Sequence, residues 1–133
     1  MARTLTEMDH VRIFNLLRRE SAAGASSYSA IVNVIDTATL VRPQDVSPDV
    51  VTMESRFLVA NPNGPDRSEL TLCWPADADP AAGKLSILSP VGASMLGLKV
   101  GDVARWSTPD GERGAATILE VVFQPEVNGD FVA

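Results

Sequence analysis

The first forty residues carry apolar side chains at helical spacing. The pattern predicts a helix over residues 6–20, capped by Thr6 with Asp9 three residues further on, and a second helix over residues 29–41. The two apolar stripes consist of Val11, Ile13, Phe14, Leu16 and Leu17, and of Ile31, Val34, Ile35, Ala38 and Val41. Because residues 21–27 are small and form a turn, we expect an antiparallel helical hairpin, a short coiled coil. The β-branched residues of the second segment also favour a strand.

The hydrophobic period changes after two prolines. Pro43 and Pro48 stop helix formation, so residues 42–48 form the natural boundary within the chain. We therefore expect two parts, an N-terminal helical hairpin over residues 1–45 and a body over residues 46–133.

Alternating apolar and polar residues predict strands through the body. The first strand covers residues 51–59, with its better-buried face formed by Val51, Met53, Ser55, Phe57 and Val59. Further strands are expected at residues 69–75, 85–88, 103–107 and 115–123. Ser89 and Pro90 predict the start of a short helix, and Gly97 and Gly101 allow it to end. The predicted fold is α+β, a meandering antiparallel sheet with one short helix.

The charge balance argues against direct binding of nucleic acid. Eleven Lys and Arg residues stand against seventeen Asp and Glu residues, which gives a net charge of −6 and a pI near 4.6. A phosphate-binding surface needs clustered basic residues, and here they are scattered. No apolar run approaches the roughly 20 residues of a membrane helix, and no signal core follows the N-terminus. We therefore expect a cytoplasmic protein with no membrane partner.

The residues that usually carry catalysis are nearly absent. Cys73 is the single cysteine, in an apolar strand-like run, and is interpreted as a small buried hydrophobe. His10 is the single histidine, interpreted as a solvated residue on a helix face. Asp77 and Asp79 form a carboxylate pair in a loop, where they are interpreted as solvated rather than as a weak cation site. The sequence therefore predicts no enzyme activity, no cofactor and no metal site.

Two tryptophans and one turn have two interpretations each. Trp74 and Trp106 are interpreted first as core residues, with an anchor for a binding partner as the alternative. Residues 88–93 begin a helix in either case, and the rigid Ser89–Pro90 step beside apolar Leu88 is also suited to a preorganised docking edge.

Three motifs together resemble one family. Residues 89–102, read with Pro109-Asp110-Gly111, resemble the C-terminal domain of the bacterial transcript-cleavage (Gre) factors. The flanking motifs at residues 51–56 and 124–131 are similar to the regulator of nucleoside diphosphate kinase (Rnk) branch of that superfamily. The resemblance covers residues 46–133, and the hairpin agrees in kind.

The resemblance implies a fold and a partner. It implies a body like that of the FK506-binding proteins and binding to RNA polymerase at the rim of the secondary channel. The docking loop of the family corresponds here to Leu88, Ser89, Pro90 and Val91, with Ser94 as an exposed neighbour; Leu88 replaces the polar residue of many cleavage factors. Cleavage factors carry acidic residues at the tip of a longer coiled coil, whereas residues 21–27 contain no carboxylate. The resemblance thus implies a non-catalytic regulator that competes with Gre factors without stimulating cleavage.

Two other function classes stay open at the level of sequence. The fold would also permit a prolyl isomerase or a pocket for a small ligand, although the few aromatic residues are poorly suited to an aromatic-lined pocket. A protein–protein adaptor that acts on another partner, with an apolar hairpin surface forming a homodimer, is the third hypothesis.

Overall fold

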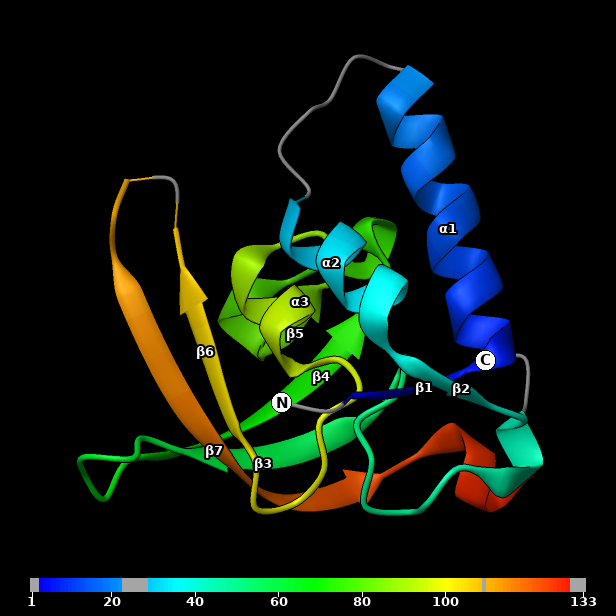
Figure 1. Ribbon diagram of the computed structural model, residues 1–133. Helices are drawn as coiled ribbons and strands as arrows, with labels where there is room; N and C mark the ends of the chain where they lie inside the picture. Colours follow the sequence, from blue (N-terminus) through cyan, green and yellow to red (C-terminus); the bar gives the residue numbers. More distant parts are fainter. Residues whose placement is uncertain (1–2, 23–28, 109, 130–133) are drawn as a thin grey trace.

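A computed structural model describes residues 3–22, 29–108 and 110–129 (Figure 1). The helices and strands are β1 (Thr4–Thr6), α1 (Glu7–Ala22), α2 (Ser29–Thr37), β2 (Thr39–Val41), β3 (Arg56–Ala60), β4 (Arg67–Cys73), β5 (Lys84–Ser86), α3 (Pro90–Met95), β6 (Val103–Ser107) and β7 (Arg113–Phe123). Short 3-10 turns follow at Pro43–Asp45 (η1), Pro75–Asp77 (η2), Pro80–Ala82 (η3) and Pro125–Asn128 (η4). The α+β class is confirmed.

The strands in these ranges form a curled five-stranded sheet in the order β5-β4-β3-β7-β6, and a separate pair β1-β2. Figure 1 shows the sheet curling around α3, with the β6–β7 hairpin on one side of the molecule and α1 on the other. α2 packs against α3. The buried residues of α1, α2, α3 and the sheet form one cluster, which includes Ile13, Ile31, Phe57, Met95 and Ile118.

Two elements of the structure differ from the prediction, and in both the difference comes from strand pairing. The second helix ends at Thr37 instead of continuing to Val41, and residues 39–41 pair in parallel with residues 4–6. The β-branched Thr39 and Val41 lie in this strand, although the other β-branched residues of the segment lie in the helix. The predicted sheet is likewise not wholly antiparallel, since β4 and β5 run parallel. Residues 74–83 cross over in η2 and η3, so β5 enters the sheet in the same direction as β4.

The strand predicted over residues 51–59 begins only at Arg56. Residues 51–55 bend instead: the N–H of Ser55 donates to the carbonyl of Thr52, and Glu54 has a φ of 67°. The face predicted to be buried is nevertheless buried at all five positions, with Val51, Met53, Ser55, Phe57 and Val59 at most 6% exposed. The alternation therefore identified the core side chains and not the backbone conformation.

The N-terminal segment begins with a capped helix and is joined to the body by a backbone hydrogen bond. Thr6 caps α1 as predicted, since its Oγ1 accepts from the N–H of Asp9 at 3.0 Å. The N–H of Thr4, just before the helix, donates to the carbonyl of Gly97 in the body at 3.0 Å. The turn predicted at residues 21–27 falls mostly outside the described residues, and the coiled-coil hairpin and the boundary at residues 42–48 stay predictions.

The left-handed conformation of Glu54 gives a testable expectation. A residue with a β-carbon at positive φ costs about 1 kcal/mol more than glycine does. We expect Glu54→Gly to be more stable than Glu54→Ala by about 1 kcal/mol, measured by urea denaturation, because both remove the carboxylate and only glycine relieves the strain. Equal stability of the two variants would show that the backbone at this position is not strained.

Candidate protein-docking surface

The turn before α3 is held by one serine. The side-chain hydroxyl of Ser89 donates to the carbonyl of Ser86 at 2.7 Å and accepts from the N–H of Gly92 at 3.0 Å. The N–H of Ser89 donates to the same carbonyl at 3.1 Å, and the N–H of Leu88 donates to the hydroxyl of Ser86 at 3.1 Å. Ser89 is thus the N-cap of α3, as predicted, with Pro90 at the first helical position. These bonds fix the backbone of residues 86–92.

Gly92 lets the turn lie directly on the helix. A β-carbon at this position would overlap the carbonyl oxygen of Ser86, which is backbone and cannot rotate away. The close approach therefore depends on glycine at this place in the sequence.

The predicted docking residues divide into two groups. Leu88, Ser89, Pro90 and Val91 are half-buried, and the side chains of Leu88 and Val91 pack against the core while part of each reaches the surface. Ser94 is only 5% exposed, and its hydroxyl donates to the carbonyl of Val91 at 2.6 Å. The expectation of an exposed Ser94 was wrong, because this residue lies on the inward side of the short helix.

The opposite end of α3 is held by Arg3. Its Nη1 lies 3.2, 2.9 and 2.9 Å from the carbonyl oxygens of Ala93, Ser94 and Leu96. These carbonyls lie at the end of the helix, where a positive charge is favourable. Burial lowers the pKa of Arg3, while the nearby Asp102 raises it. Nothing in the sequence signalled this contact, which joins residues ninety or more positions apart.

Trp106 lies between two hollows beside α3. On β6 it faces Gly114 of β7, where any β-carbon would overlap the indole ring. One hollow of about 280 Å³ is mainly aliphatic and lies between the sheet and α3; it includes Leu70, Leu85, Val91 and Met95. A second hollow of about 280 Å³ lies between α2, α3 and β6 and includes Arg3, Asn33, Pro90, Arg105 and Ser107. Trp106 lines both hollows, is half-buried and packs against the core, in agreement with the core interpretation; a role as an anchor for a binding partner stays a prediction.

Trp74 lies at a separate cleft. This cleft of about 530 Å³ is formed by α1 and the start of η2, and includes Arg12, Asn15, Arg19 and Pro75. The guanidinium of Arg12 lies 4.9 Å from the ring centroid of Trp74, and the indole N–H has no hydrogen-bond partner among the described residues.

The candidate chemical residues are mostly structural. Cys73 is 1% exposed, as predicted; burial raises the pKa of its thiol, and its Sγ donates to the carbonyl of Leu85 at 3.4 Å. His10 is half-buried instead of solvated, because its Nε2 lies 3.1 Å from the carbonyl of Ile35 and so links α1 to α2. Asp77 and Asp79 are exposed. Within the described ranges, no three His, Cys, Asp or Glu residues are grouped as metal ligands.

A buried acid was not anticipated. Asp9 is 3% exposed, and its Oδ2 accepts from the backbone N–H of Met53 at 3.0 Å. Burial raises the pKa of Asp9 to about 6, and the nearby carboxylate of Glu126 acts in the same direction. Glu126 in turn accepts from the hydroxyl of Thr52 at 2.7 Å. In sequence Asp9 looked like an ordinary first-turn acid, and its burial depends on the bend at residues 51–55.

In the part of the chain that the structure describes, no helix could cross a membrane.

Comparison with known proteins agrees with the motifs. Residues 37–123 match the family described as "Transcription elongation factor, GreA/GreB, C-term". The chain is 35% identical over 128 residues to the "Regulator of nucleoside diphosphate kinase" of Escherichia coli K12, covering 96% of this chain and 94% of that protein. It is 30% identical over 98 residues to the GreA of Chloroherpeton thalassium, of which it covers 62%.

A solved structure is similar over nearly the whole chain. It is described as a prokaryotic transcription elongation factor GreA/GreB from Nitrosomonas europaea, with a TM-score of 0.74, 31% identity, and coverage of 91% of this chain and 99% of that one. The Gfh1 protein of Thermus thermophilus, with 20% identity and a TM-score of 0.51, shares the fold. The protein therefore belongs to the GreA/GreB C-terminal domain family, in the branch of the regulators of nucleoside diphosphate kinase.

Proposed function

We propose that the protein is a non-catalytic transcription regulator that binds RNA polymerase near its secondary channel. It would compete there with Gre-type factors and would not stimulate transcript cleavage. Membership of the GreA/GreB family carries the proposal, because the matched region, residues 37–123, contains the whole turn from Ser86 to Gly92.

The geometry of that turn supports a docking role for Leu88, Ser89, Pro90 and Val91. Hydrogen bonds through Ser86 and Ser89 hold its backbone in one conformation, and Pro90 restricts it further. A preorganised surface loses little conformational entropy when a partner binds. The exposed parts of Leu88 and Val91 then offer apolar contact area at a fixed position.

Two features, the length of α1 and the composition of residues 21–27, support a protein that does not stimulate cleavage. α1 has sixteen residues. At 1.5 Å per residue, such a helix extends about 24 Å. Residues 21–27 contain no carboxylate, and a catalytic magnesium ion needs oxygen ligands of that kind. We infer that the protein occupies the polymerase without supplying a metal ligand.

The test is binding to purified core RNA polymerase, with and without excess GreA, together with a transcript-cleavage assay on stalled complexes. We expect saturable binding that GreA displaces, and no cleavage above that of polymerase alone. Stimulated cleavage would contradict the non-catalytic part of the proposal. Binding that GreA leaves unchanged would contradict the shared site.

The double variant Leu88→Asp, Pro90→Ala tests the docking turn. We expect it to bind polymerase about tenfold more weakly, because an anchoring apolar contact is lost. Leu40→Asp is the matched control, since Leu40 is 44% exposed on β2 and lies outside the turn. Thermal melting of both variants checks that the loss is not unfolding, because Leu88 also packs against the core. Equal binding by both variants would show that the docking assignment is wrong.

An adaptor that acts as a homodimer is the second candidate. It is favoured by the outer face of α1, where Val11 is 53% exposed and Phe14, three residues on, is 48% exposed. A dimer in light scattering that Phe14→Ser dissociates, combined with no polymerase binding, would support this function. A monomer that binds polymerase would exclude it.

A further inference from the structure

Trp106 divides one surface into an apolar half and a basic half. The indole is held in place because it lies across Gly114 on the neighbouring strand, with no room for a side chain beneath it. The hollows on its two sides both reach α3, one at Val91 and the other at Pro90. The surface is therefore continuous with the turn at residues 88–91.

The apolar half suits one hydrophobic side chain. Its volume is about 280 Å³, and its walls are the aliphatic side chains of Val59, Leu70, Leu85, Val91 and Met95 together with Trp106. Polar residues lie at Asn61, Asp66 and Ser68. An aliphatic side chain that entered this hollow would lose its contact with water, and the burial of apolar surface favours binding.

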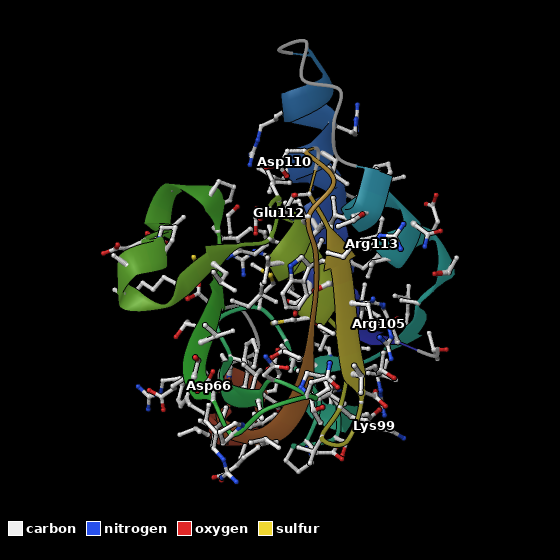
Figure 2. All side chains as sticks on the ribbon, turned by 90° about the vertical axis from the view of Figure 1, so that its left-hand side faces the viewer. Asp66, Lys99, Arg105, Asp110, Glu112 and Arg113 are labelled. Carbon is white, nitrogen blue, oxygen red and sulfur yellow. The ribbon has the colours of Figure 1, made fainter. Side chains whose placement is uncertain are left out.

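The basic half is lined by two arginines. Among the described residues its lining includes Arg3 and Arg105 and no acidic residue, and Asp102 lies near Arg3. Arg105 is exposed on β6 and forms no ion pair or hydrogen bond with any described residue, whereas Arg3 is engaged by the carbonyls of α3. Figure 2 shows Arg105 on the outer β6–β7 hairpin, below Arg113. A local positive site in a chain of net charge −6 favours an acidic partner at this position.

We infer that the surface around Trp106 recognises a protein segment in which an apolar side chain stands next to a carboxylate. The apolar side chain enters the hollow at Val91 and Leu85, and the carboxylate pairs with Arg105. This inference rests on the proposed function and assigns the segment to the polymerase. A nucleic acid fits less well, because the two arginines are few and Asp66 and Asp102 lie near the same surface.

Two pairs of variants test the two halves by titration against core polymerase. Arg105→Glu is compared with Arg113→Glu, an equal charge reversal on the adjacent strand that lines neither hollow. Ser68→Phe is compared with Asn63→Phe; Ser68 is exposed at the apolar hollow on the same face as Val59, and Asn63 is exposed in the turn beyond it. All four positions are exposed, so the variants should fold, and thermal melting verifies this.

We expect Arg105→Glu to bind about tenfold more weakly than the wild type. This loss of affinity should become smaller as salt is raised from about 50 to about 300 mM, because salt screens contacts between charges, with a Debye length of about 10 Å at 0.1 M. Ser68→Phe should lose about tenfold at every salt concentration, because it fills the apolar hollow. Both control variants should bind like the wild type.

Two outcomes would overturn the inference, and they are distinguishable. If the wild type binds and all four variants bind equally well, the surface around Trp106 is not used, while the proposed function stands. If the wild type does not bind polymerase at any salt concentration, the proposed function and this inference both fail.

Discussion

Replacing Gly92 with alanine is expected to lower the free energy of unfolding by about 3 kcal/mol or more. The new β-carbon would overlap the carbonyl oxygen of Ser86, which accepts bonds from both the N–H and the hydroxyl of Ser89. Relief requires the turn to move off the helix, with loss of the cap at Ser89. For a chain of this size, the melting temperature should fall by roughly 10 °C, which thermal denaturation followed by circular dichroism would detect.

Gly64→Ala is the matched control for this substitution. Gly64 is exposed in the turn after β3, and a β-carbon there would meet no heavy atom within 4 Å. Its stability should stay within about 0.5 kcal/mol of the wild type. If Gly92→Ala melted at the wild-type temperature, the turn would be able to move freely and would not be a preorganised docking surface.

Asp9→Asn is expected to stabilise the protein at pH 7.5 by up to about 3 kcal/mol. The amide can still accept the N–H of Met53, while the cost of burying a carboxylate near Glu126 disappears. The folded-state pKa of Asp9 is raised to about 6 from its ordinary 3.8, so the folded state holds its proton more strongly than the unfolded state does.

The sign of the pH dependence follows from that raised pKa. Between pH 3.8 and 6 the folded state binds more protons at Asp9, so this residue contributes stability that is fully present at low pH and lost as the pH rises through about 6. The advantage of Asp9→Asn should therefore vanish below about pH 4, in urea denaturations between pH 3.5 and 8. Asp36→Asn, on the exposed face of α2, serves as the control. An advantage independent of pH would mean that Asp9 does not titrate in this range.

The local signals in the sequence predicted α1, α3 and the strands of the β6–β7 hairpin. Thr6, Ser89 and Pro90 act through their immediate neighbours, so their effect can be read without the rest of the chain. β2 could not be found in this way, because residues 39–41 become a strand only through pairing with residues 4–6. The parallel entry of β5 depends in the same way on the crossover at residues 74–83.

The sequence identified the segment that contains the docking turn, but it did not identify the residues from other elements that complete the surface around it. The motif at residues 88–91 identified the turn, but the inward position of Ser94 depends on the packing of a helix only six residues long. Arg3, Trp106 and Arg105 come together from β6 and the N-terminus, at sequence separations that no motif covers. Contacts of that kind form only when the chain has folded, so a local sequence pattern does not reveal them.

The position of β3 in the middle of the sheet has a consequence for synthesis on the ribosome. β3 lies between β4, which follows it at once, and β7, which is made some fifty residues later. Until β7 leaves the exit tunnel, one edge of β3 stays unpaired and the core around Phe57 stays open on that side. A nascent chain cut short before residue 113 would keep this edge exposed and available to other chains. Interrupted translation should therefore yield aggregating fragments rather than a smaller folded protein.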